Sequence, residues 1–493
     1  MIMRLSTGHH IPTILLLLLA TLLSACYEKE ELSTTPIEAE KKAPYVVVTD
    51  SLFLSPDEYM EYYAKNNLNP EIAQLYQILN PLYRIVYNTR IPKLEALFQQ
   101  ESQSAGTQDA TWGIASYAFH YKSTSAKGGE ITLSGRVSFP RYSSPKLNHS
   151  LTSLTLFFRP YDITIPSKRE RELGLRVLYN SAVIEPDFEG YGISEEQGSC
   201  NISHAANAIQ MADCIEAALQ LMKQHHVTLS PEGYSTSWGI SLGAPNLLAF
   251  ARYYETEATS QFKESVRLHS SAAINGPVRL DKVLEHCNQV DTFSTCLLHT
   301  LMNGFEALPA ERREGYSLKE LVPEWMQTRQ LSINLPNADI NMTGSYYELW
   351  MKNFGFYAMM FAGDFSFAAW RLSDVLAPDM LDEEGHLKED SPKVRMLRKI
   401  LTEQYDWSQW TPQTPLYMAH HPKDGGIPYD QAREQYKLFA QRGGNVFWYD
   451  DTLPSTLEGN SFLIHFMTTY MNYLRCVACE YPSELAHTLQ AIN

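Results

Sequence analysis

A short stretch near the middle of the chain, GYSTSWGISLGAP, constrains the fold more than any other part of the sequence. It spans residues 233–245. Its first part has the composition of a strand, and the helical pattern APNLLAFARYYE follows directly from Ala244. A strand that turns at once into a helix crowds the residue at the turn, so small residues are needed two positions before and after it. Gly239 and Gly243 provide this spacing and predict a sharp turn with Ser241 at its tip.

Ser235 is the other serine that this stretch offers for such a turn. Gly233 stands two positions before it, but Ser237 stands two positions after it, and more strand-like residues follow. A serine inside a strand is poorly placed to attack a substrate, because the sharp turn is what exposes the hydroxyl. The sequence therefore favours Ser241 over Ser235 as a nucleophile.

Strand-like and helical patterns alternate along much of the chain. Residues 54–100 have apolar side chains at helical spacing, and residues 111–140 alternate as a hairpin around a Lys-Gly-Gly turn. Further strands are expected at 153–158, 180–192, 233–240, 267–274, 415–421 and 445–450, and helices at 205–225, 244–255, 429–443 and about 461–475. This alternation predicts an α/β fold, with a mostly parallel sheet and helices on both of its faces.

Residues 277–410 interrupt the alternation. They are rich in helix formers and aromatic residues and lack clear parallel strands. This predicts a helical cap insertion at the carboxyl edge of the sheet, the alternative being helices that simply pack on the sheet. The run Tyr346–Trp370 within it either lines a pocket or forms ordinary core. The rest of the folded chain then divides into an N-terminal helical region with the first part of the core, 45–276, and the C-terminal part of the core, 411–493.

Two motifs in the sequence resemble motifs of a known family. Gly239-Ile-Ser-Leu-Gly243 resembles the nucleophile turn of the α/β-hydrolase superfamily, and PDFEGYGIS, residues 186–194, resembles a glycine-rich turn of the same family. The likeness spans roughly residues 111–480 and points to secreted lipase- and esterase-like lipoproteins of Bacteroidota. It implies an α/β-hydrolase fold and a serine hydrolase that cleaves carboxylic esters through an acyl-enzyme, with no metal or organic cofactor. PDFEGYGIS is expected to be structural, holding Asp187 and Tyr191 near the mouth of the site.

The resemblance also implies the two partners of Ser241. The segment HHPKDGGIPY, residues 420–429, resembles the acid loop of the family and makes Asp424 the acid, the alternative being a turn aspartate that caps the next helix. The base follows the acid in this family, and only His465 and His487 follow Asp424. His465, at the start of the last helix or within it, is the expected base, the alternative being a packed helical residue.

Two backbone N–H groups are expected to bind the oxyanion of a tetrahedral intermediate. The first is that of Leu242, at the N-terminus of the helix after Ser241. The second belongs to the loop after the strand 153–158, where family members often have His-Gly and this chain has Arg159-Pro160-Tyr161. Because proline has no N–H, Tyr161 is the expected donor.

The N-terminus predicts export. Residues 1–25 have one cation, Arg4, and an apolar run that is too short for a comfortable membrane span, as in a signal peptide. Leu23-Ser24-Ala25-Cys26 resembles a bacterial lipobox, which implies lipidation of Cys26 and a membrane lipid anchor. Residues 26–44 form a charged tether, and Lys29-Glu30-Glu31 resembles a surface-export signal. An outer-membrane lipoprotein on the cell surface is therefore expected.

The charge and the cysteines of the chain bear on three questions: nucleic-acid binding, disulfide formation and metal binding. The net charge of −16 argues against a nucleic-acid partner, because phosphate binding needs a clustered basic surface. Six cysteines follow Cys26, and Cys287 with Cys296 is a candidate local disulfide. These two cysteines with His286 and His299 match no standard zinc spacing, so no metal site is expected.

The sequence leaves three functions open. The leading one is hydrolysis of a small-molecule carboxylic ester. The same three residues also serve peptidases that release short peptides. The third is a surface lipoprotein that binds its ligand without catalysis, which the Arg159-Pro160 loop and the late position of His465 favour.

Overall fold

The computed structural model describes most of the chain. The described residues are 45–65, 70–107, 110–144, 146–158, 175–197, 203–289, 293–335, 340–352, 370–404, 406–424 and 426–450, together with 465 and 468. The predictions made for the signal peptide, for Cys26 and the tether, and for Tyr161 lie outside these residues.

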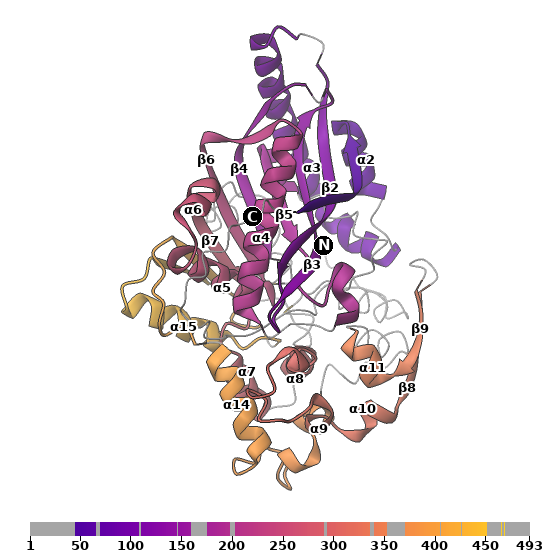
Figure 1. Ribbon diagram of the computed structural model, residues 1–493, viewed down its shortest axis with the longest axis vertical. Helices are drawn as coiled ribbons and strands as arrows, with labels where there is room; N and C mark the ends of the chain where they lie inside the picture. The colour runs from indigo at the N-terminus through magenta and orange to yellow at the C-terminus, as the bar shows by residue number, and fades with distance from the viewer. Residues whose placement is uncertain are drawn as a thin grey trace, which may run out of the picture.

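The centre of the described fold is a nine-stranded sheet (Figure 1). Its strands are β1 (Val46–Leu54), β2 (Trp112–Thr124), β3 (Glu130–Tyr142), β4 (His149–Phe158), β5 (Ser181–Pro186), β6 (Val227–Ile240), β7 (Leu268–Ile274), β10 (Leu416–His420) and β11 (Val446–Asp450). Their order is β1-β2-β3-β5-β4-β6-β7-β10-β11. The pairs from β5 to β11 are parallel, whereas β1, β2, β3 and β5 pair antiparallel. The predicted mostly parallel sheet and the predicted hairpin are both confirmed.

One strand was not anticipated. The segment before the N-terminal helices forms β1, which pairs with β2 from Val46↔Tyr121 to Leu54↔Ile114. Its sequence, VVVTDSLFL, mixes apolar and polar residues, and most of its side chains are exposed or only partly buried. A strand at the edge of a sheet needs no continuous apolar run, so its pattern is weak.

Helices cover both faces of the sheet. They are α2 (Pro56–Lys65), α3 (Pro70–Ser104), α4 (His204–Gln224), α5 (Gly243–Thr256), α6 (Ser260–Val266) and α15 (Tyr429–Gln441). On one face, Phe98 of α3 packs edge-on against Tyr142 of β3, with ring centroids 4.8 Å apart. On the other, Cys214 of α4 lies so close to Gly135 of β3 that a Cβ there would meet the sulfur at 2.9 Å. Side chains seven positions apart on a strand point to opposite faces, so α3 and α4 enclose the sheet.

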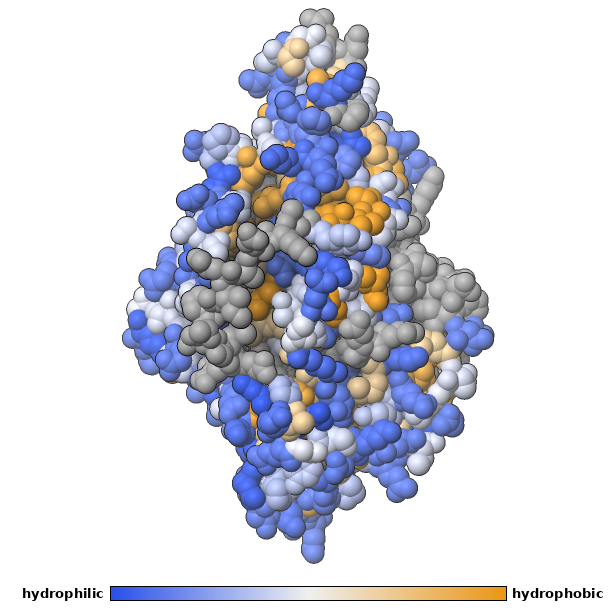
Figure 2. Space-filling model, viewed as in Figure 1, coloured by the Kyte–Doolittle hydropathy of each residue, from blue (hydrophilic) through white to orange (hydrophobic). Residues whose placement is uncertain are grey.

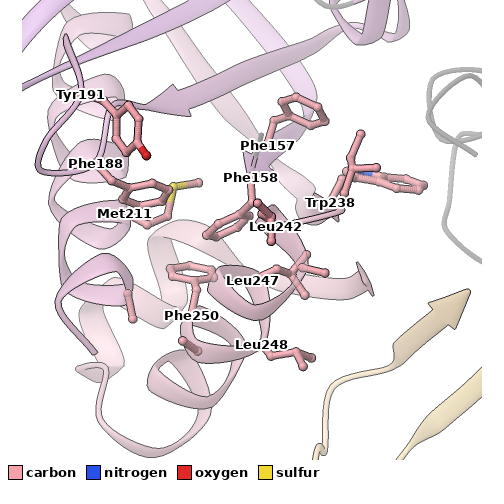
Figure 3. Packing of buried hydrophobic residues seen from close by; sticks show 14 of the residues in the cluster. Phe157, Phe158, Phe188, Tyr191, Met211, Trp238, Leu242, Leu247, Leu248 and Phe250 are labelled. Atoms are coloured by element: carbon pink, nitrogen blue, oxygen red, sulfur yellow. The ribbon is translucent and has the colours of Figure 1, made fainter. Parts of the chain in front are cut away.

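Aromatic and aliphatic side chains fill the layer between the sheet and the helices α4 and α5 (Figure 3). Phe158, at the end of β4, lies 5.6 Å from Phe250 of α5 and 6.4 Å from Phe188, between ring centroids. All three are buried, and the side chain of Leu242 packs beside them in the same view. This packing fixes α5 and therefore the turn that precedes it.

The segment between β7 and β10 forms the lower end of the molecule in Figure 1. It contains α7 (Leu280–Cys287), α8 (Phe293–Met302), α9 (Leu318–Leu321), α10 (Glu324–Thr328), α11 (Tyr346–Met351), α13 (Leu372–Val375) and α14 (Pro392–Gln404). It is mainly helical, as predicted, but also holds an antiparallel hairpin of β8 (Gln330–Leu335) and β9 (Ile340–Ser345). On the face shown in Figure 2, this end is mostly hydrophilic.

An aromatic cluster stabilises the insertion from within. His299 of α8 stacks on Trp350 with ring centroids 4.1 Å apart, meets Trp370 edge-on at 5.2 Å, and shares a hydrogen bond of 2.6 Å with Tyr346. These side chains are buried. The described ends of the run Tyr346–Trp370 are therefore core, and residues 353–369 lie outside the description.

The predicted Cys287–Cys296 disulfide is wrong. Cys287 is a free, buried thiol at the end of α7, inside the helical packing of the insertion. Cys214 is also free and buried. Within the described part of the chain, no helix has the length and apolarity that crossing a membrane requires.

Candidate functional site

Ser241 occupies the turn that the sequence predicted. β6 ends at Ile240 and α5 begins at Gly243, so only two residues separate strand from helix. Ser241 has a positive φ of 50°, a conformation that costs a non-glycine residue energy and persists only where its surroundings enforce it. Its N–H donates to the Ile274 carbonyl of β7 at 2.7 Å, and its carbonyl accepts from the Ala244 N–H at 3.0 Å. These bonds hold the turn against the end of β7.

Close backbone contacts on both sides of the turn require glycine. A Cβ at Gly239 would lie 2.6 Å from the Gly243 carbonyl oxygen, so the two glycines of the predicted spacing approach each other. A third glycine, Gly276, which was not predicted from the sequence, also leaves room for the turn. A Cβ at Gly276 would collide with Ala244 and lie 2.6 Å from the Ser241 carbonyl oxygen. Glycine is needed at these positions because any side chain would displace the turn.

Ser235 has a structural role. It lies inside β6, is buried, and its hydroxyl donates to the Val266 carbonyl at the end of α6. The next serine, Ser237, donates to Ser271 of β7 at 2.7 Å. Both hydroxyls are therefore engaged in joining parts of the sheet and its helices.

The structure brings the three predicted residues into one hydrogen-bonded line. Ser241 Oγ lies 3.2 Å from His465 Nε2, and His465 Nδ1 lies 2.6 Å from Asp424 Oδ2. All three are buried, with exposed fractions of 0%, 2% and 4% for Ser241, His465 and Asp424. A hydroxyl, an imidazole and a carboxylate in this order can pass a proton from oxygen to nitrogen while the carboxylate stabilises the resulting charge.

Asp424 lies in the loop between β10 and α15, as predicted. Its Oδ1 accepts from the N–H groups of Gly426 at 2.9 Å and Ile427 at 3.0 Å. Its Oδ2, which faces His465, also accepts from the side-chain amide of Asn275 at 3.3 Å. Both carboxylate oxygens are therefore saturated, and the orientation of the carboxylate is fixed.

A second histidine approaches the same carboxylate. His420, at the end of β10, has its Nε2 3.4 Å from Asp424 Oδ2 and 2.9 Å from the Ile427 carbonyl oxygen. Burial alone would raise the pKa of Asp424. The charge of His465 and the hydrogen bonds from His420 and His465 outweigh burial and hold that pKa well below its usual range. The carboxylate therefore stays ionised across the neutral range.

The site contains residues that the sequence analysis did not single out. Asn275 and Gly276 directly follow β7, and Thr468 lies one helical turn after His465. The register places Ile240 beside Ile274, and Ile274 beside Ala419, so these parallel strands end at one edge of the sheet. A polar residue directly after a buried parallel strand is the signal that would have drawn attention to Asn275.

The two expected oxyanion donors differ in outcome. Leu242 precedes α5 with helical backbone angles, φ −68° and ψ −12°, so its N–H belongs to the free N-terminal end of that helix. Tyr161 lies outside the described residues.

The turn PDFEGYGIS fastens the β2–β3 hairpin. Asp187 accepts from the hydroxyl of Ser134 in β3. Glu189 accepts from the Ser125 hydroxyl at 2.7 Å and from the Ala126 N–H at 2.6 Å, both in the hairpin turn. These contacts give the turn a structural role at the hairpin, and the expected position of Asp187 and Tyr191 near the mouth of the site stays a prediction. Across the described residues, no group of three or more His, Cys, Asp or Glu side chains is arranged to hold a metal ion.

Comparison with known proteins identifies the fold. No protein-family model matches the sequence, and no curated protein matches it. Solved structures do match. A ligand-bound form of the rice cell wall degrading esterase LipA from Xanthomonas oryzae is 18% identical with a TM-score of 0.55, over 87% of this chain and 96% of that chain. A putative hydrolase from Legionella pneumophila is 14% identical with a TM-score of 0.54, over 88% of this chain and 98% of that chain. Likeness at these identities concerns architecture, and the chain has the α/β-hydrolase fold that was predicted.

Proposed function

We propose that this chain is a serine hydrolase that cleaves carboxylic esters of small molecules. The observation that carries the proposal is the buried line from Ser241 Oγ through His465 to Asp424, with contacts of 3.2 Å and 2.6 Å. A surface serine that meets a histidine by chance would not also have a positive φ and a histidine oriented by a buried carboxylate.

In the proposed mechanism Ser241 is the nucleophile. His465 Nε2 takes the hydroxyl proton as Ser241 Oγ attacks the ester carbonyl carbon, and Asp424 stabilises the imidazolium that forms. The C–O bond of the ester breaks as His465 returns the proton to the leaving alcohol. Water then attacks the acyl-enzyme by the same route, which releases the carboxylic acid and restores Ser241.

The tetrahedral intermediates carry a negative oxygen that needs donors. The Leu242 N–H supports this role because it belongs to the positive end of α5, next to Ser241. We propose the Tyr161 N–H as the second donor on sequence grounds alone. The insertion 277–410, which starts directly after the end of β7, is the proposed cap that selects the substrate.

The description of one similar structure favours an ester over a peptide as the substrate. The Xanthomonas protein is described as an esterase that degrades rice cell wall. No contact among the described residues favours the peptidase or the non-catalytic binding protein over the esterase.

Labelling with a fluorophosphonate probe tests the proposal. The soluble mature chain, starting after Cys26, is compared with Ser241→Ala, His465→Ala and Ser235→Ala. Labelling should be lost in the first two variants and kept in the third, because the Ser235 hydroxyl is engaged with Val266. A folded wild type that does not react would overturn the proposal. Labelling that survives Ser241→Ala would show that Ser241 is not the nucleophile.

The substrate class needs a second measurement. Short p-nitrophenyl esters are compared with aminoacyl p-nitroanilides at equal concentration. Turnover of the esters alone supports the esterase. Turnover of the anilides at a comparable rate would favour the peptidase, and ligand binding without turnover of either would favour the binding protein.

We also propose that the chain is anchored through lipid on Cys26 to the outer membrane and faces outward. The support is the Leu23–Cys26 lipobox and the charged segment after it. Incorporation of a labelled fatty acid should disappear in Cys26→Ser. Protease added to intact cells should digest the protein, and full protection would place it on the inner side.

A further inference from the structure

The residue directly after β7, Asn275, connects the two partners of Ser241. Its side-chain nitrogen donates to Asp424 Oδ2 at 3.3 Å and to Thr468 Oγ1 at 2.9 Å. The Thr468 hydroxyl in turn donates to the His465 carbonyl at 3.0 Å. An amide has two N–H hydrogens, so one nitrogen serves both contacts. Asp424 and the backbone of His465 are thereby joined by a second route, in addition to their direct contact.

The backbone at Asn275 is fixed to the same parts of the site. The Ile274 carbonyl accepts from the Ser241 N–H at 2.7 Å, and the Asn275 N–H donates to the Ala419 carbonyl of β10 at 2.8 Å. One peptide unit therefore touches the turn that carries Ser241 on one side and the strand that leads to Asp424 on the other. The Asn275 side chain is completely buried, so its amide is not exchanging these contacts for water.

The conformation of Asn275 is itself uncommon. Its φ is 47°, in the left-handed region that glycine adopts without cost. Asparagine tolerates this region better than other side chains, but glycine would satisfy the backbone alone. An asparagine here supplies a buried amide that donates to both Asp424 and Thr468, which indicates a role for the side chain.

We propose that Asn275 is a positioning residue, which holds Asp424 and the His465 segment at a fixed separation so that His465 Nε2 faces Ser241. The inference rests on the proposed hydrolase function. Asn275 touches neither the substrate nor the reacting atoms, and it acts through Asp424 and Thr468. Its loss lets the carboxylate and the imidazole shift relative to each other, and small displacements of this kind slow a reaction strongly.

Replacement by glycine tests this inference with little backbone strain. Asn275→Gly keeps the positive φ and removes the amide. Asn180→Gly is the matched control. Asn180 is also buried, has a φ of 56°, and donates from its side chain to the Ser150 carbonyl at 3.0 Å, but it precedes β5 at the opposite edge of the sheet. Thr468→Val removes the second half of the connection while keeping the volume of the side chain.

Ester hydrolysis is measured over a range of pH for the four proteins. Asn275→Gly should lower kcat about 10- to 100-fold with KM changed less than about threefold, by analogy with the loss of groups that orient a catalytic ligand. The pH profile of kcat/KM should change as well, because Asp424 Oδ2 loses one of its hydrogen-bond donors. Thr468→Val should change kcat in the same direction by less, and Asn180→Gly should leave both quantities unchanged.

A spectroscopic measurement separates position from stability. The proton between His465 Nδ1 and Asp424 Oδ2, which lie 2.6 Å apart, should give a far-downfield signal in proton NMR of the wild type. This signal should weaken or exchange faster in Asn275→Gly and persist in Asn180→Gly. Equal losses of activity in the two glycine variants, or a wild-type kcat and pH profile in Asn275→Gly, would overturn the inference while leaving the hydrolase in place. A wild type that neither hydrolyses esters nor reacts with a fluorophosphonate would instead overturn the proposed function, and the inference with it.

Discussion

Asp424 holds His465 through one carboxylate oxygen and its own loop through the other. Oδ2 lies 2.6 Å from His465 Nδ1, and Oδ1 accepts from two backbone N–H groups of the loop. The loop cannot rotate the carboxylate without breaking these bonds. The proton of the neutral imidazole is therefore held on Nδ1, and the lone pair on Nε2 faces Ser241.

Replacing Asp424 by asparagine should remove most of the activity. An amide nitrogen placed at Oδ2 would donate to Nδ1 and so favour the tautomer with its proton on Nε2, which cannot accept from Ser241. We expect kcat for a p-nitrophenyl ester to fall about 10³- to 10⁴-fold. Steady-state kinetics checks this, with thermal unfolding as the control for the fold. A fall of less than tenfold in a folded variant would mean that Asp424 is not the orienting acid.

Gly276 should tolerate no side chain. Gly276→Ala places a methyl group against Ala244 and 2.6 Å from the Ser241 carbonyl oxygen, so the turn must move. We expect a loss of about 1–3 kcal/mol in unfolding free energy together with slower labelling of Ser241. Gly344→Ala in β9 is the control, since its methyl would meet no backbone atom and its nearest neighbour, at 3.0 Å, is the end of the Glu348 side chain. Chemical denaturation measures the unfolding free energy of both variants, and equal values would contradict the expectation.

Stability should fall as pH drops below neutral. Burial lowers the pKa of His204 and that of His299 to about 3. Each takes up a proton on unfolding between its unfolded pKa, about 6.5, and its folded value. The unfolded state binds more protons in this window, so each group reduces the unfolding free energy by about 1.4 kcal/mol per pH unit as pH falls.

Urea unfolding at pH 6 and pH 5 measures this slope, above the range in which Asp424 titrates. His299→Gln should reduce the slope by one proton. An unchanged slope in His299→Gln would show that His299 binds its proton in the folded protein.

The two buried thiols should resist alkylation. Burial raises the pKa of Cys287 to about 12 and also raises that of Cys214, so neither forms the reactive thiolate near neutral pH. Iodoacetamide followed by peptide mass spectrometry should find both residues unmodified in the native protein and modified in denaturant. Rapid native modification of Cys287 would contradict its placement in the packed end of α7.

Local patterns predicted the parts of the site that are local. The glycine spacing around Ser241 and the change from strand to helix lie within a few residues, so the turn was visible in the sequence. The prediction of Asp424 and His465 depended on the order in which a similar family arranges its nucleophile, acid and base along the chain. β1 was not predicted because an edge strand lacks an apolar run. The hairpin β8–β9 was not predicted because the segment around it is helical.

Asn275 and Thr468 could not be found in this way. Asn275 lies 149 positions from Asp424 and 193 from Thr468, and no spacing rule connects residues so far apart. Their meeting depends on β7 and β10 ending at the same edge of the sheet. The predicted Cys287–Cys296 pairing was wrong for the opposite reason, because nearness in sequence alone does not pair two cysteines, and Cys287 is a buried free thiol at the end of α7.

The contact between Ser241 and His465 spans 224 positions, and the whole insertion is synthesised between them. A nascent chain that has completed Ser241, its turn and even the insertion still holds an inert alcohol, because neither the imidazole nor the carboxylate has been made. The same is true of any fragment that ends before β10. The proposed reactive centre can therefore form only after His465, 224 positions beyond Ser241, has been added to the chain.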